Sequence, residues 1–223
     1  MASSTDSYAR VWNARLDGIP DQPAERLYAR GAHIADALAA PTVAVVGARA
    51  CSGYGSHVAR MLARDLAAAG VTVVSGLARG IDGEAHRGAL DADGRTLAVL
   101  GCGIDRDYPA AHAELARRIA ETGGILSEYE AGIEPAPWRF PARNRIIAAL
   151  ADAVVIVEAR SRSGALITVD LAMEIGRPIY AVPGEITSAL SEGTNDLLRH
   201  GWATALTSAL DVLEALGIKG ASA

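Results

Sequence analysis

Glycine, arginine and serine gather in short segments that each follow a run of β-branched residues. Three of these segments cover residues 47–55, 75–82 and 158–164, and each holds at least one arginine. Glycines allow backbone N–H groups to approach an anion, and a helix that follows turns the positive end of its dipole toward that anion. A tight turn explains any single segment as well, but several together favour a phosphate-binding site.

A second unusual segment covers residues 134–145. It places the single phenylalanine of the chain, a tryptophan and three arginines in a proline-stiffened loop that runs into a helix. Aromatic side chains that stack on bases, among guanidinium groups that bind phosphates, are typical of single-stranded nucleic-acid binding. Alternatively, Phe140 anchors the loop in the core and the arginines pair with Glu128 or Glu130. The segment on its own leaves both interpretations open.

Signatures of cofactor chemistry and catalysis are missing from the sequence. Lys219 is the one lysine, so no P-loop is possible, and the glycines lack dinucleotide-binding spacing. His86 with Asp82 could form an acid–base pair, but Asp82 as a helix cap with His86 packed beside it is the simpler interpretation. Cys51 and Cys102 lack zinc-site spacing. We therefore expect no cofactor and no metal.

The elements that must position these residues alternate in type from residue 41 onward. This pattern predicts an α/β fold with a doubly wound, mostly parallel, Rossmann-like sheet, in which ligands bind outside the carboxyl ends of the strands. Strands are expected at 42–46, 71–75, 96–100, 125–127, 153–158 and 179–182. Helices are expected near 56–69, 83–91, 109–121, 143–150, 165–175, 194–200 and 208–216.

Three regions are expected along the chain. Residues 1–40 form an N-terminal extension with no strand signal and one or two short helices, residues 41–205 form the Rossmann-like domain, and residues 206–223 form a C-terminal helix. An apolar stripe on that helix is either a lid on the core or a dimer interface, and the sequence favours neither. The stripe consists of Leu210, Leu213 and Leu216.

Charge and hydropathy argue against several classes of function. The chain has 223 residues with 26 acids and 21 bases, a net charge of −5, which argues against a generally basic nucleic-acid coat. Residues 138–162 reverse this balance, with five arginines against two acids. No apolar run approaches the ~20 residues that span a bilayer, and the N-terminus lacks a secretory pattern. These features predict a cytoplasmic protein that does not enter membranes.

Taken in order, the segments resemble the DprA/Smf family, the DNA-processing protein A of natural transformation. The matching stretches run over about residues 40–205 and include VAVVGAR (43–49), SGLARGID (75–82), FPARNRIIAAL (140–150), SGALIT (163–168) and GRPIYAVPG (176–184). The resemblance implies a Rossmann-like homodimer that binds single-stranded DNA, protects incoming DNA and assists loading of a RecA-type recombinase. It also implies that the protein is not an enzyme.

The resemblance further implies a DNA-binding set at matching positions. That set is Gly47, Arg49, Arg79, Gly80, Phe140, Arg143, Arg145, Ser163, Gly164 and Thr168. Ala48 replaces the serine of the family's GSR-like motif. Many members also carry an N-terminal SAM-like helical domain and a C-terminal winged helix. In this sequence we expect only a remnant of the first and none of the second.

An alternative function remains open at the sequence level. The loop at 163–168 is also similar to that of the LOG-type phosphoribohydrolases, which cleave nucleoside monophosphates. Their P-G-G-x-G-T-x-x-E motif requires a glutamate three residues after the threonine, where this chain has Leu171, and Glu174 comes three residues later. The resemblance therefore favours a binding protein, with a nucleotide-binding module as a further alternative.

Overall fold

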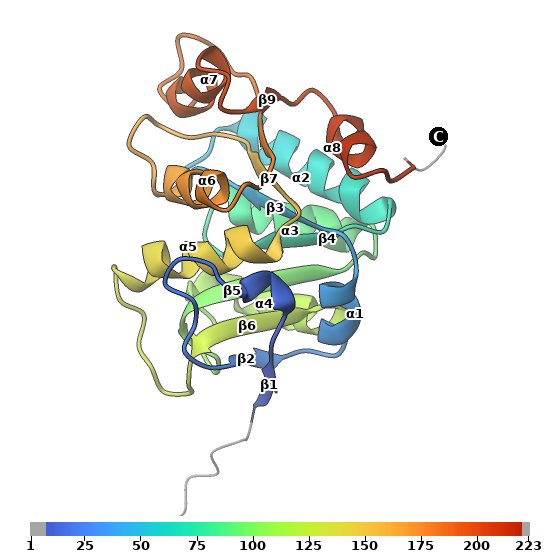
Figure 1. Cartoon of the computed structure of the whole chain (residues 1–223), viewed down its shortest axis with the longest axis vertical. Coiled ribbons are helices and arrows are strands. Elements are labelled where there is room, and N and C mark those ends of the chain that lie inside the picture. The colour runs from blue at the N-terminus through green and yellow to red at the C-terminus, as the bar shows by residue number, and fades with distance from the viewer. Residues whose placement is uncertain (1–7, 220–223) are drawn as a thin grey trace, which may run out of the picture.

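A single nine-stranded sheet organises the chain, for which a computed structural model describes residues 8–219 (Figure 1). The strand order is β1-β2-β6-β5-β4-β3-β7-β8-β9. The strands are β1 (Ala9–Val11), β2 (Leu27–Arg30), β3 (Thr42–Val46), β4 (Thr72–Ser75), β5 (Thr96–Gly103), β6 (Gly124–Tyr129), β7 (Ala153–Ile156), β8 (Ile179–Ala181) and β9 (Thr204–Ala205). All neighbours from β6 to β9 are parallel, and β1 and β2 are antiparallel additions at one edge.

Helices cover both faces of this sheet. They are α1 (Ile34–Ala39), α2 (Gly53–Ala68), α3 (Ile81–Asp91), α4 (Ala113–Thr122), α5 (Arg139–Leu150), α6 (Gly164–Glu174), α7 (Glu192–Arg199) and α8 (Ala209–Ala215). Alternate residues of β3 serve opposite faces: Ala44 and Val46 pack with α1, α5 and α6, whereas Val43 and Val45 pack with α2, α3 and α8. The predicted doubly wound, mostly parallel fold is confirmed.

The sheet reverses its winding between β3 and β7. From β3 the chain proceeds through β4 and β5 to β6 on one side, and β7, β8 and β9 follow on the other. The two central strands are in direct register, from Val43 opposite Ala153 to Val46 opposite Ile156. In open α/β sheets a ligand-binding crevice forms at such a switch point, outside the carboxyl ends of the strands.

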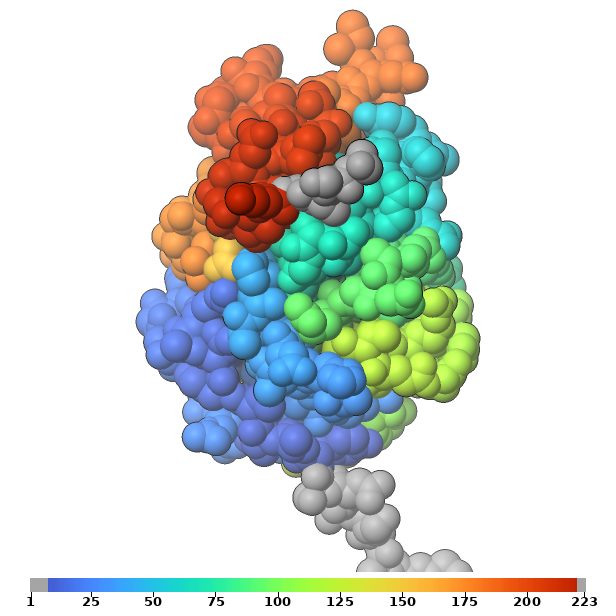
Figure 2. Space-filling view, turned by 90° about the vertical axis from the view of Figure 1, so that its right-hand side faces the viewer, coloured from blue at the N-terminus to red at the C-terminus, as the bar shows by residue number. Residues whose placement is uncertain are grey.

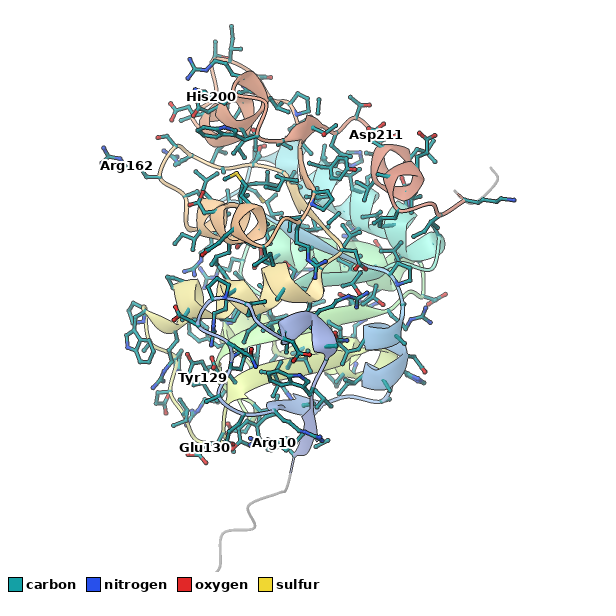
Figure 3. All side chains as sticks on the ribbon, viewed as in Figure 1. Arg10, Tyr129, Glu130, Arg162, His200 and Asp211 are labelled. Atoms are coloured by element: carbon teal, nitrogen blue, oxygen red, sulfur yellow. The ribbon has the colours of Figure 1, made fainter. Side chains whose placement is uncertain are left out.

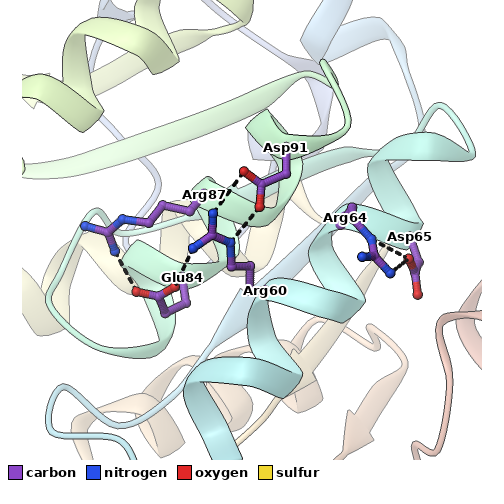
Figure 4. A network of polar contacts seen from close by, with 6 residues as sticks. All are labelled: Arg60, Arg64, Asp65, Glu84, Arg87 and Asp91. Atoms are coloured by element: carbon purple, nitrogen blue, oxygen red, sulfur yellow. Dashed lines mark hydrogen bonds and ion pairs between the residues drawn. The ribbon is translucent and has the colours of Figure 1, made fainter. Parts of the chain in front are cut away.

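Helices α2 and α3 pack unusually closely, and ion pairs join them along their exposed side (Figure 4). Gly88 makes the approach possible, because a Cβ there would lie 2.1 Å from the carbonyl oxygen of Arg60. The Arg60 guanidinium then reaches Asp91 at 2.6 Å and Glu84 at 3.9 Å, and Arg87 also binds Glu84 at 2.7 Å. These contacts fix the two helices against each other, and with them the starts of α2 and α3 that follow the β3 and β4 loops.

The N-terminal segment differs from the sequence prediction. Residues 1–40 were expected to contain no strand, yet β1 and β2 lie there, and β2 pairs with β6, with Tyr28 opposite Ser127. Strands of three or four residues give little sequence signal, and the open edge of β6 supplies the hydrogen-bond partners that make β2 a strand. Residues 1–7 of the predicted extension lie outside the described residues.

The C-terminal stripe lies mainly against the core. Leu213 is buried and Leu216 is half-buried, and both pack on the apolar cluster that includes α2, whereas Leu210 is exposed. Figure 2 shows this C-terminal part (red) on the α2 region (teal), with the N-terminal segment (blue) at the opposite end of the molecule. The stripe thus acts as a lid, and residues 220–223 lie outside the described residues. Within residues 8–219, no helix is both long enough and apolar enough to span a bilayer.

Candidate nucleic-acid interface

A cavity of about 860 Å³ opens at the switch point. This volume is within the range of pockets that bind small molecules. Three parts of the chain form most of its wall: the β3–α2 loop, the first turns of α5, and the β7–α6 loop with the start of α6. Seven of the ten predicted DNA-binding residues line it, namely Gly47, Arg49, Phe140, Arg143, Ser163, Gly164 and Thr168. The fold therefore brings together segments that lie far apart in the sequence.

Arg143 forms the floor of the cavity and is only 4% exposed. Its Nη1 atom donates to the carbonyl oxygen of Gly76 at 2.7 Å and to that of Val99, which joins α5 to the end of β4 and to the middle of β5. A Cβ at Gly76 would lie 2.3 Å from the guanidinium, so a larger residue there would displace the Arg143 side chain from this position. Burial lowers the pKa of Arg143 to about 10, and the carboxylate of Asp82 opposes that shift.

Asp82 lies beside Arg143 on the same floor and is 7% exposed. Burial raises its pKa, while the nearby charges of Arg143 and Arg49 act in the opposite direction. The carboxylate accepts a hydrogen bond from the backbone N–H of Ala78 at 3.4 Å, which closes the loop before α3. Asp82 was expected to cap the helix, but Gly80 is the N-cap residue of α3 and Asp82 is the second residue inside the helix, so its carboxylate fastens the preceding loop instead.

An aromatic wall rises from the floor. The rings of Phe140 and Tyr108 stack with centroids 5.4 Å apart, and the Arg49 guanidinium lies 5.2 Å from the Phe140 centroid. Phe140 is half-buried against Gly101, whereas Tyr108 and Arg49 are exposed. Within residues 8–219, Arg49 forms no ion pair, although its charge acts on the nearby carboxylate of Asp82.

The helix that follows Arg49 offers no free N-terminus, which differs from our expectation that its dipole faces the ligand. Glu158, at the end of the β7 region, accepts from the Ser52 N–H at 2.9 Å and from the Ser52 hydroxyl at 2.5 Å. A Cβ at Gly55 would lie 2.4 Å from this carboxylate. An internal anion therefore occupies the start of α2.

The start of α6 is open, in contrast to that of α2. Ser163 caps it by accepting from the Ala165 N–H at 3.3 Å, and a Cβ at Gly164 would meet no atom within 4 Å. Thr168, one turn further on, is 1% exposed and lines the cavity. These groups can receive the oxygens of an anion.

Three predicted site residues lie outside the cavity lining. Arg79 is exposed in the neighbouring turn. Gly80 has φ +73°, and a Cβ there would lie 2.2 Å from the carbonyl oxygen of Ala48. This glycine therefore allows the β4–α3 loop to pack closely on the β3–α2 loop. Arg145 donates to Glu128 at 2.7 Å and to the carbonyl oxygen of Asp21 at 2.5 Å, as the alternative interpretation of the loop had it.

Arg160 and Arg162 were not among the predicted site residues, although the sequence analysis had already pointed to the arginine-containing segment 158–164 as phosphate-binding. Both are exposed on the cavity rim and, within the described part of the chain, neither pairs with a carboxylate. Arg162 projects from the molecule on the side where α5 begins (Figure 3). Tyr108 was also missed, because its stacking on Phe140 joins residues 32 positions apart and depends on the tertiary fold.

Comparison with known proteins decides the family. A sequence profile of the family described as DNA recombination-mediator protein A matches residues 5–217. The chain belongs to this family. The predicted resemblance to DprA/Smf is confirmed, since a DprA-type protein of Mycobacterium tuberculosis is 51% identical over 191 residues, covering 86% of this chain and 49% of that protein. The chain thus spans about half the length of the curated relatives it matches.

Two solved structures of this family resemble the chain closely. DNA processing protein A (DprA) of Streptococcus pneumoniae is 41% identical with a TM-score of 0.88, covering 94% of this chain and 75% of that one. DNA processing protein A of Helicobacter pylori is 33% identical with a TM-score of 0.85, covering 94% of each chain. The second structure concerns a single-stranded DNA binding mode of the Helicobacter protein.

Proposed function

We propose that this chain binds single-stranded DNA in the switch-point cavity, with little sequence preference. The observation that supports this proposal most is that guanidinium groups without a carboxylate partner among residues 8–219 surround one opening together with stacked aromatic rings. Phosphates are bound by Arg49, by Arg160 and Arg162 on the rim, and by the open start of α6. Bases stack on Phe140 and Tyr108, and stacking tolerates every base because each has a π-face.

Charge distribution supports a single strand as the ligand. The whole chain carries −5, so a long duplex lying across its surface meets net repulsion. A flexible strand can enter a cavity whose rim is locally positive. An unpaired base can also reach an aromatic wall, which a base inside a duplex cannot do without leaving its stack.

Binding rather than catalysis is the proposed role of the cavity. The position that carries the glutamate in the LOG-type motif holds Leu171, which packs on the core, and Glu174 is exposed outside the cavity lining. Incubation with AMP should therefore release no free adenine in a chromatographic assay. Measurable adenine release would replace the binding proposal with the enzymatic one.

The wider role follows from the family. We infer that the protein acts in the cytoplasm as a homodimer, protects incoming single strands during natural transformation and assists loading of a RecA-type recombinase. Two findings support this: the family is described as a recombination mediator, and the Helicobacter relative has a single-stranded DNA binding mode. A pull-down of the cognate recombinase by the tagged chain, with and without single-stranded DNA, tests the partnership. Failure to capture it under both conditions would contradict it.

Fluorescence anisotropy tests the DNA-binding proposal directly. Labelled oligo-dT and a duplex of matched length are titrated at low and at physiological salt. The expected result is tighter binding of the single strand at both salt concentrations. Equal affinity for the two ligands, or no binding even at low salt, would overturn the proposal.

A further inference from the structure

A second stack of planar side chains lies at the start of α5, outside the cavity. The Arg139 guanidinium is 4.9 Å from the centroid of the Tyr129 ring and 4.7 Å from that of the Trp138 ring. Tyr129 ends β6, and Trp138 and Arg139 begin α5, so two elements contribute to this ladder. Trp138 is 63% exposed.

Neither core packing nor ion pairing accounts for this ladder. Trp138 belongs to none of the three apolar clusters of the fold. Arg139 donates to the carbonyl oxygen of Glu134 but, within residues 8–219, has no carboxylate partner, so its charge remains available to an external anion. An exposed indole with an uncompensated guanidinium beside it is a combination suited to a nucleotide, whose base stacks and whose phosphate pairs.

The ladder and the cavity lie on different sides of the start of α5. Pro137 and Phe140 line the cavity and Trp138 does not. Side chains two residues apart on a helix do not face each other, so Trp138 and Phe140 point in different directions. In Figure 3 the labelled Arg162 projects at the left of the molecule above the start of α5, and the labelled Tyr129 lies below the start of α5, further inward. A strand leaving the cavity around this helix end therefore meets the ladder next.

We propose that Trp138, Arg139 and Tyr129 form a second base-stacking subsite for single-stranded DNA, reached by nucleotides that continue from the cavity. This inference rests on the proposed function of the cavity. The outer face of Trp138 takes one base, Tyr129 supports the guanidinium from behind, and Arg139 neutralises a neighbouring phosphate. The subsite lengthens the footprint on the strand without reading its sequence.

Tryptophan fluorescence reports directly on the subsite. Titration of the parent protein with oligo-dT should quench emission, and Trp138→Phe should lose most of that quenching. Trp202→Phe is the matched control, since Trp202 is 54% exposed and also stacked, with its centroid 4.5 Å from that of His200, but it has no arginine on its ring. The emission of the Trp202→Phe control should be quenched by oligo-dT as strongly as that of the parent. Equal quenching in the Trp138 variant would overturn the proposal.

A length series separates this proposal from the function of the cavity. Anisotropy is measured with oligo-dT of increasing length for the parent, Trp138→Ala and Trp138→Tyr. Trp138→Ala should weaken binding of long oligonucleotides about tenfold and leave the shortest bound oligonucleotide unaffected, while Trp138→Tyr should recover most of the loss. Because Trp138 is exposed, all variants should keep the parent melting temperature.

The length series distinguishes a failure of the cavity proposal from a failure of the subsite proposal. If the parent binds no oligo-dT, the proposed function of the cavity fails and the subsite with it. If the parent gains affinity with length and Trp138→Ala gains it equally, the cavity proposal stands and the subsite is wrong. In that case Trp138 and Arg139 would suit a protein partner instead, since Trp and Arg are frequent at the centres of protein interfaces.

Discussion

Arg49 is the side chain on which the proposed phosphate contact depends most. It is exposed, it lies over the Phe140 ring, and it has no carboxylate partner among the described residues. A guanidinium in this position can hold two phosphate oxygens, which a lysine cannot imitate. We expect Arg49→Ala to weaken single-stranded DNA binding by ~1.5–3 kcal/mol and to reduce the salt slope by about 0.7.

Arg10→Ala is the control for this measurement. Arg10 pairs with Glu25 and lies over the Tyr28 ring at 3.8 Å, at the β1 edge of the sheet and away from Arg162 in Figure 3. Anisotropy titrations at several salt concentrations should leave this variant unchanged. If Arg49→Ala lowered the melting temperature and kept its DNA affinity within twofold, Arg49 would be a brace for the loops and the binding site would lie elsewhere.

Arg143 should behave in the opposite way, as a residue on which the fold depends. Arg143→Met removes donors from two backbone carbonyl groups in a buried place and takes away the stronger of the two positive charges that act on Asp82. The expected loss in unfolding free energy is about 3 kcal/mol, or roughly 6–12 °C in melting temperature for a chain of this size. An unchanged thermal melt would contradict the structural role described for Arg143.

At the scale of elements, α3 carries a buried titratable group that links stability to pH. His86 bonds Thr96 at 2.7 Å, and burial, with the charges of His112, Arg143 and Arg87 nearby, lowers its pKa from 6.5 to about 3. The folded state thus binds fewer protons than the unfolded state between these values. Its contribution to stability is complete above pH 6.5 and is lost as the pH falls.

His86→Gln tests this linkage, because glutamine can still bond Thr96 and does not titrate. Between pH 7 and pH 5 the parent should lose about 2 kcal/mol more unfolding free energy than the variant, as measured by urea denaturation. The raised pKa of Asp82 acts in the opposite direction, but it is present in both proteins and cancels. Equal losses would show that His86 is protonated without penalty in the fold.

The sequence predicts some elements well for an identifiable reason. Strand β3 was expected at 42–46 and is Thr42–Val46, because an apolar run bounded by turns is a strong signal for a strand buried on both faces. Strands β1, β2 and β9 were missed, since none of them contains a run of β-branched residues and each depends on a neighbouring edge.

In the candidate site, too, some features have a local sequence signal and others depend on the tertiary fold. Arg49, Phe140 and Ser163 follow strands or begin helices, so their meeting at one edge could be predicted from topology. The contact of Glu158 with Ser52 joins positions 106 apart in the chain, and Glu128 holds Arg145 across the sheet edge. Which cations remain free for a ligand therefore depends on tertiary pairing, and that pairing leaves no local pattern.

At the scale of the whole molecule, the proposed dimer is the feature to measure. Leu213 and Leu216 are used within the chain, so the exposed Leu210 alone cannot hold two copies together and another surface must contribute. Light scattering at micromolar concentration should give twice the 23.0 kDa of one chain. A mass near 23 kDa would remove the homodimer, whatever the outcome of the DNA titrations.

The reversal of winding between β3 and β7 also governs when the site can exist during synthesis. During synthesis, residues 47–50, which form one wall of the cavity, emerge from the ribosome long before residues 160–168, which form the opposite wall. On the proposed function, a nascent chain completes this site only when α6 has emerged and docked beside α5. A strand bound only by the finished fold then stabilises that fold by about 2.7 kcal/mol at a hundredfold excess over Kd.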